Sequence, residues 1–102
     1  MARINLSFND KEYVIEYNRA SIREFLKVKE NLDELDQVIA LIKCGLIMHH
    51  KKDMPDEDEI FGWVMAMGDD IKDFAEALRE MVQEALDVIK TDRKNLKWEK
   101  VA

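Results

Sequence analysis

The fold class of this chain is decided by residues 3–17, whose sequence is RINLSFNDKEYVIEY. Apolar and polar residues alternate on both sides of Asn9-Asp10, a pair that tolerates the positive φ angles of a tight two-residue turn. With that pair as the loop, one face of a β-hairpin collects the apolar residues Ala2, Ile4, Leu6, Tyr13, Ile15 and Tyr17. An isolated hairpin is only marginally stable, so we expect it to pack on the helices that follow.

Four helices are predicted after the hairpin, at about residues 21–30, 33–49, 56–67 and 69–90. The first begins with a capping-box pattern from Ser21 to Glu24, in which a hydroxyl and a carboxylate satisfy free backbone amides. Gly68, followed by two aspartates, indicates either a stop and a new start or one continuous kinked helix. In the last helix, apolar residues repeat every three or four positions from Ile71 to Ile89.

The second predicted helix has a wide apolar stripe. Its expected buried side comprises Leu35, Val38, Ile39, Ile42, Leu46 and Ile47. Leu41 widens this stripe, so the helix is expected to be covered on more than one side. These patterns predict a single α+β domain, mostly α, over residues 1–90, with the hairpin packed on a bundle of about four helices. Residues 91–102 are predicted to form a tail.

Composition and charge indicate which kinds of macromolecule this chain can bind. The chain has 102 residues, of which 47% are hydrophobic and 37% charged, with a net charge of −6. Residues 53–87 carry a net charge of −10, which repels phosphate backbones and argues against nucleic acid. Residues 88–102 carry a net charge of +3, which suits contact with the acidic stretch of a neighbouring copy. The single cysteine, Cys44, lies in an apolar run and is predicted to be a buried, inert thiol in a reducing compartment.

No apolar run approaches the roughly 20 residues needed to span a bilayer, and the first residues lack the apolar core of a secretory signal. We therefore expect a soluble protein without membrane association that stays inside the cell that makes it.

Two patterns that suggest a metal are better explained by helix ends. His49 and His50 point about 100° apart on a helix, and zinc needs three or four converging ligands. They are expected to form a polar helix end. The acidic run 56–59 fails the calcium-loop template, because its sixth and twelfth positions are Phe61 and Met67. We expect a solvated helix start there and predict no metal. Since neither a phosphate-binding loop nor a catalytic constellation is present in the sequence, we also predict no cofactor and no enzymatic activity.

Methionine and tryptophan residues are the candidates for binding a protein partner. Methionine is flexible and suits variable apolar partners, although it also fills gaps in a core. Trp98 either docks back on its own domain or anchors a partner. The predicted partner-binding residues are Met48, Trp63, Met65, Met67, Leu96 and Trp98.

Three stretches together resemble the tail assembly chaperones of long-tailed phages and prophages of Gram-positive bacteria. Residues 7–22 resemble the N-terminal hairpin-and-cap signature of that family, residues 46–50 its mid-chain helix end with paired histidines, and residues 95–99 its short C-terminal motif. Two stretches depart from the family pattern. Residues 42–45 lack its aromatic residue and Gly-Ala pair, and residues 91–94 are short and basic where many members are longer and acidic.

The resemblance implies a role in virion assembly. Such proteins coat the long, helical, apolar tape measure protein in the host bacterial cytoplasm before tail tube subunits polymerise around it. They are then displaced and are absent from the mature virion. The expected partners are therefore the tape measure protein and the tail tube protein, and the apolar face of the last helix predicts self-association into a homo-oligomer. Two alternatives stay open: a structural component of the tail or connector, and a bacterial regulatory module that binds one protein partner.

Overall fold

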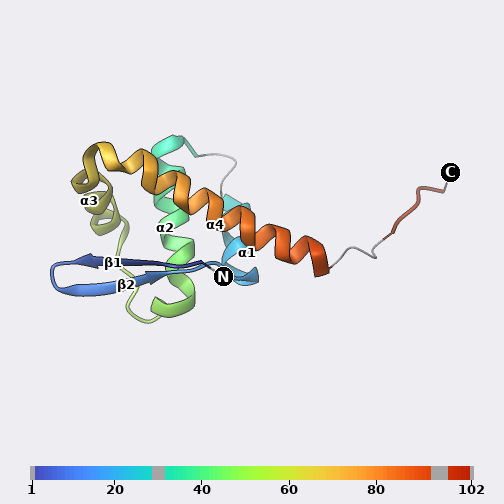
Figure 1. The fold of residues 1–102 in the computed structure, drawn as a ribbon, viewed down its shortest axis with the longest axis horizontal. Coiled ribbons are helices and arrows are strands. Elements are labelled where there is room, and N and C mark those ends of the chain that lie inside the picture. Colours follow the sequence, from blue (N-terminus) through green and yellow to red (C-terminus); the bar gives the residue numbers. More distant parts are fainter. Residues whose placement is uncertain (1, 29–31, 93–96, 102) are drawn as a thin grey trace.

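The computed structural model describes residues 2–28, 32–92 and 97–101. Its elements in chain order are the strands β1 (Ile4–Phe8) and β2 (Lys11–Ile15), the helices α1 (Arg19–Val28), α2 (Glu34–His50) and α3 (Glu57–Met67), a 3₁₀ turn (Gly68–Asp70) and the helix α4 (Ile71–Asp92). The fold is α+β and mostly α, with the hairpin against the helices, as the sequence predicts (Figure 1).

The hairpin forms with the predicted turn and register. Asn9 and Asp10 have φ angles of 51° and 64°, so both adopt the left-handed conformation of a two-residue hairpin loop. Leu6 pairs with Tyr13 and Ile4 pairs with Ile15 across the ladder. Tyr13, Ile15 and Tyr17 of the apolar face are all buried.

The outer edge of β2 and the segment after it are bonded to α2. The Glu16 amide donates to the Gly45 carbonyl at 2.9 Å, and the Val14 amide donates to Nε2 of His50 at 2.9 Å. The Tyr17 hydroxyl donates to the Leu41 carbonyl at 2.6 Å. Because these amides would otherwise form an open strand edge, α2 completes the hairpin and protects it from edge-to-edge pairing.

The start of α1 corrects the predicted cap. Asn18, not Ser21, is the N-cap: the Ser21 amide donates to Oδ1 of Asn18 at 2.8 Å, and the Asn18 amide donates to the Ser21 hydroxyl at 2.7 Å. The helix therefore begins at Arg19, and Ser21 takes the position that Glu24 was expected to hold in the capping box. Asparagine is as good an N-cap as serine, which is why the two starts compete in the sequence. Glu24 instead forms a surface ion pair with Lys27.

Helix α2 lies at the centre of the domain and contacts β2, α1, α3 and α4. Its N-cap is Asp33, which accepts from the Asp36 amide at 2.8 Å. The prediction that α2 is covered on more than one side is confirmed, because Leu41 and Cys44 are buried along with the expected stripe. Two residues of that stripe are exceptions: Ile47 is only half-buried, and Leu35 is exposed. Leu35 is 38% exposed, since it lies in the first turn of α2 at the edge of a groove described below.

Helices α3 and α4 are separate. Asp56 caps α3 by accepting from the Glu59 amide, and Gly68 ends it with a φ angle of 57°. Of the two alternatives predicted for Gly68, the end of one helix before the start of the next is confirmed. A 3₁₀ turn leads into α4. In Figure 1, α4 crosses in front of α2 and α1, and its apolar stripe buries Ala75, Leu78, Met81, Val82 and Ala85. The helix continues to Asp92, two residues beyond the predicted end.

Candidate functional site

The structure separates the residues that the sequence predicts to bind a partner. Met48, Met65 and Trp98 are 44%, 53% and 86% exposed, and Met67 is half-buried. Leu96 lies outside the described residues. Trp63 is only 2% exposed and belongs to the core, so its prediction as a partner-binding residue is corrected. Of these side chains, that of Met65 lines a groove described below.

Trp63 joins the hairpin to α3. Its ring centroid lies 4.8 Å from that of Tyr13 and 6.0 Å from that of Phe8, both with tilted planes. Such aromatic contacts add to the stability gained from burial alone. Its indole Nε1 is buried without a hydrogen-bond partner among the described residues. Trp63 therefore helps to hold the hairpin in place.

The two histidines connect the end of α2 to the hairpin. Nε2 of His50 accepts from the Val14 amide, so the ring proton lies on Nδ1, which donates to Asp53 at 3.2 Å. His49 lies 3.1 Å from Glu16. The sequence placed both histidines correctly at a helix end, and the structure shows that their partners are the hairpin and Asp53.

The hydrogen bond from His50, followed by that from Lys11, holds the pKa of Asp53 below its usual value. The described residues contain no group of three or more histidine, cysteine or acidic side chains that could hold a metal ion.

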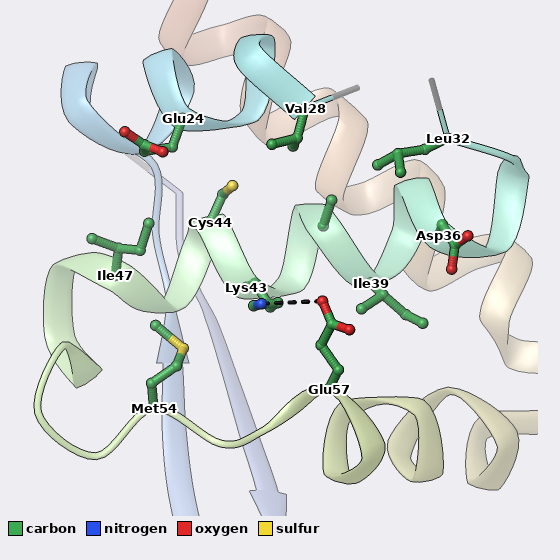
Figure 2. Close-up of a pocket in the computed structure, with 11 residues that line it drawn as sticks. Glu24, Val28, Leu32, Asp36, Ile39, Lys43, Cys44, Ile47, Met54 and Glu57 are labelled. Carbon is green, nitrogen blue, oxygen red and sulfur yellow. Dashed lines mark hydrogen bonds and ion pairs between the residues drawn. The ribbon is translucent and has the colours of Figure 1, made fainter. Parts of the chain in front are cut away.

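A first groove, the α1–α2 groove, has a volume of about 490 Å³. Figure 2 shows Val28 and Glu24 reaching down from α1, Cys44 pointing up from α2, and Met54 and Glu57 closing the opposite side. Its apolar lining is Val28, Leu32, Ile39, Ala40, Cys44, Ile47 and Met54. The charged lining consists of three carboxylates and one ammonium, those of Glu24, Asp36, Glu57 and Lys43.

Charge in the α1–α2 groove is unbalanced toward the negative. Lys43 is the cation of the lining, and its Nζ lies 3.2 Å from Oε1 of Glu57 in an ion pair. Cys44 adds no charge, because burial raises the pKa of its thiol to about 11. The prediction of a buried thiol is confirmed. The groove therefore combines an apolar floor with an acidic rim.

A second groove, the α3–α4 groove, is wider, with a volume of about 870 Å³. Three helices supply its apolar lining, which consists of Leu35, Val38, Val64, Met65, Ile71 and Ala75. The rim carries two carboxylates and two cations, those of Glu34, Glu76, Lys72 and Arg79. Met65 and Leu35 are the most exposed of the apolar residues. This groove therefore offers an accessible apolar surface that includes the predicted partner-binding residue Met65.

The grooves themselves were missed from the sequence. Met65 was singled out by residue type, whereas Leu35 was placed in the core and Ile71 was assigned only to the stripe of the last helix. A groove depends on the angle between helices, which helical periodicity does not encode. A smaller apolar groove between α1 and α4, lined by Ile22, Leu26, Leu86 and Ile89, was missed for the same reason.

None of the described helices combines the length and the continuous apolarity required to cross a membrane. Comparisons of this chain with protein-family models, with curated proteins and with solved structures find no significant match.

Proposed function

We propose that this chain is a phage tail assembly chaperone, which transiently binds and solubilises the tape measure protein during tail morphogenesis and catalyses no reaction. The observation that carries the proposal is the α3–α4 groove, where Leu35 and Met65 remain exposed on an apolar floor built by three helices. The resemblance of residues 7–22, 46–50 and 95–99 to that family supplies the identity of the partner.

The α3–α4 groove suits an amphipathic helix. Such a helix inserts apolar residues at positions i, i+3, i+4 and i+7 into a groove between helices. Met65 is flexible enough to accommodate different apolar side chains along a long partner. The rim offers both carboxylates and cations, so it can pair with either sign of charge on the polar flanks of the partner helix.

The expected affinity is low for a single groove. Fully burying a leucine or methionine stabilises a complex by about 1.5–3 kcal/mol, and Leu35 and Met65 are already partly buried. A contact of this size, reduced by the entropy of association, gives weak and reversible binding. Weak binding by many copies along one partner is what a displaceable coat requires.

The proposal is tested with a helical fragment of the tape measure protein that aggregates alone. The wild-type chain is expected to keep the fragment soluble. The double variant Leu35→Gln and Met65→Gln is expected to need at least tenfold more protein for the same effect. Glutamine has a helix propensity close to those of leucine and methionine, so the helices should be retained.

Phe61→Gln is the matched control. Phe61 is 43% exposed on α3, the helix that carries Met65, and it is absent from the lining of the α3–α4 groove. Met48→Gln tests the prediction that Met48 contributes to partner binding. Continued aggregation of the fragment with excess wild-type protein would count against the proposal, as would equal losses in the double variant and in Phe61→Gln.

The proposal also includes contact with the tail tube protein during displacement, activity in the host bacterial cytoplasm, and absence from the finished particle. Mass spectrometry of purified virions tests the last point. Stoichiometric copies of this chain in mature virions would identify a structural tail component instead.

A further inference from the structure

We propose that the tail segment of one copy, residues 97–101, docks into the α1–α2 groove of a second copy, so that the chain self-associates head to tail. This inference does not depend on the proposed function, because it concerns a different groove and a different partner.

The tail segment presents an apolar anchor among basic side chains. Trp98 is 86% exposed and Val101 is 84% exposed, the two largest values among the exposed large hydrophobic residues. Lys97 and Lys100 lie next to them, with Glu99 between, so residues 97–101 carry a net charge of +1. Tryptophan buries 150–250 Å² when it is enclosed, and it is among the residues most enriched at the centres of interfaces. The segment therefore has the composition of a binding motif.

The α1–α2 groove matches the tail segment in size and in charge. Its volume of about 490 Å³ lies within the range of pockets that enclose small ligands, so an indole and a neighbouring aliphatic side chain fit within it. Val28 is 44% exposed on the α1 side and offers apolar surface to the indole. Three carboxylates against one ion-paired lysine favour a basic segment. The α3–α4 groove lacks this selectivity, because its rim carries equal numbers of both signs.

A second copy is the occupant that the geometry supports. The described tail residues lie beyond the end of α4 and away from the helices, and each of them is exposed (Figure 1). Tail and groove are different surfaces of one chain, so their pairing is heterologous. Each copy then offers one tail and one groove, and the contact repeats into a ring or an open chain.

The test is sedimentation velocity from about 1 to 100 µM, a range centred on micromolar affinity. Trp98→Ala removes the anchor, and Val28→Gln places a polar side chain in the groove. Each is expected to weaken self-association at least tenfold. Leu26→Gln is the matched control, because Leu26 lies on the same helix, is 42% exposed and lines the other, smaller groove. It is expected to associate like the wild type, and added salt is expected to weaken association.

Mixing the two defective variants separates this arrangement from a symmetric dimer. The Val28→Gln copy supplies an intact tail and the Trp98→Ala copy supplies an intact groove. An equimolar mixture is therefore expected to form 1:1 dimers and nothing larger. The emission of Trp98, obtained as the difference between wild type and Trp98→Phe, is expected to shift to shorter wavelength as the concentration rises.

Four results would overturn the inference. One is a wild-type chain that stays monomeric up to 100 µM, and another is unimpaired association of Trp98→Ala. A blue shift of Trp98 that does not depend on concentration would show that the tail docks on its own domain. Finally, normal self-association of Val28→Gln together with a loss of tape measure solubilisation would assign the groove to a foreign partner.

Discussion

Replacing Gly45 by alanine tests whether close approach of the hairpin to α2 holds the domain together. Gly45 lies in the middle of α2, where the hairpin crosses it. A Cβ atom at this position would overlap the Cγ2 methyl of Ile15 and lie 3.1 Å from Cζ of Tyr17. Ile15 is fully buried and its β-branched side chain has few alternative rotamers, so the clash is relieved only if the hairpin moves away from the helix.

The expected loss of stability is the net result of one stabilising and two destabilising contributions. Alanine favours the helix by about 1 kcal/mol relative to glycine. Overpacking a filled core costs about 1–3 kcal/mol. Moving the hairpin also weakens the hydrogen bonds from Glu16 to Gly45 and from Tyr17 to Leu41, each contributing about 0.5–1.5 kcal/mol. We therefore expect Gly45→Ala to lower the free energy of unfolding by about 1–3 kcal/mol.

The assay is urea unfolding followed by circular dichroism, with thermal unfolding alongside it. At this chain length each kcal/mol corresponds to a change in Tm of about 4–8 °C. Gly62→Ala in α3 is the matched control. Apart from its chain neighbours and the backbone of its own helix, no described heavy atom lies within 4 Å of the added Cβ, so the same change is expected to stabilise the chain by up to about 1 kcal/mol. If Gly45→Ala were as stable as Gly62→Ala, the argument from close approach would be wrong.

Three further predictions concern buried or capping groups. Tyr17→Phe is expected to lower the free energy of unfolding by about 0.5–1.5 kcal/mol in urea titrations, because it removes the buried hydrogen bond to Leu41; an unchanged midpoint would contradict this. Asn18→Ala is expected to cost about 1 kcal/mol and to lower helicity, whereas Glu24→Ala, which lacks a capping role, is expected to cost clearly less. Cys44 is expected to react with iodoacetamide at pH 8 roughly 100-fold more slowly than a free thiol, because burial raises its pKa from 9.0 to about 11. Since the unfolded thiol ionises first, stability is expected to fall as the pH rises above about 9, and rapid alkylation or a flat alkaline stability profile would refute the burial argument.

The hairpin could be predicted in detail because its determinants are local. A two-residue loop and strict alternation leave one register that buries the apolar face, and the structure adopts that register. The cap of α1 could not be predicted from the same kind of reasoning. Asn18 and Ser21 are both good N-cap residues, and they lie three residues apart. Which of them caps the helix depends on where the packed hairpin ends, and this is set by tertiary contacts.

The candidate site was less predictable than the fold. Residue type pointed to Met65 and Trp98, which are exposed, but equally to Trp63, which is buried. Position 63 shares the buried face of α3 with Ile60 and Val64, and the aromatic side chains of the hairpin cover it. Residue type alone therefore cannot separate a tryptophan of the core from an exposed tryptophan.

The two grooves lie on different faces of α2, so their roles can be tested independently. Ala40, Lys43 and Ile47 face the α1–α2 groove, whereas Leu35 and Val38 face the α3–α4 groove. At 100° per residue these two sets point roughly 140° apart.

Neither groove takes any lining residue from the described part of the hairpin. Loosening the hairpin with Gly45→Ala should therefore lower global stability without altering binding by the folded fraction. Well below its Tm, this variant should self-associate and solubilise the tape measure fragment as the wild type does. A loss of binding larger than the unfolded fraction explains would mean that the hairpin itself holds the partner, and the grooves would then not be the binding surfaces.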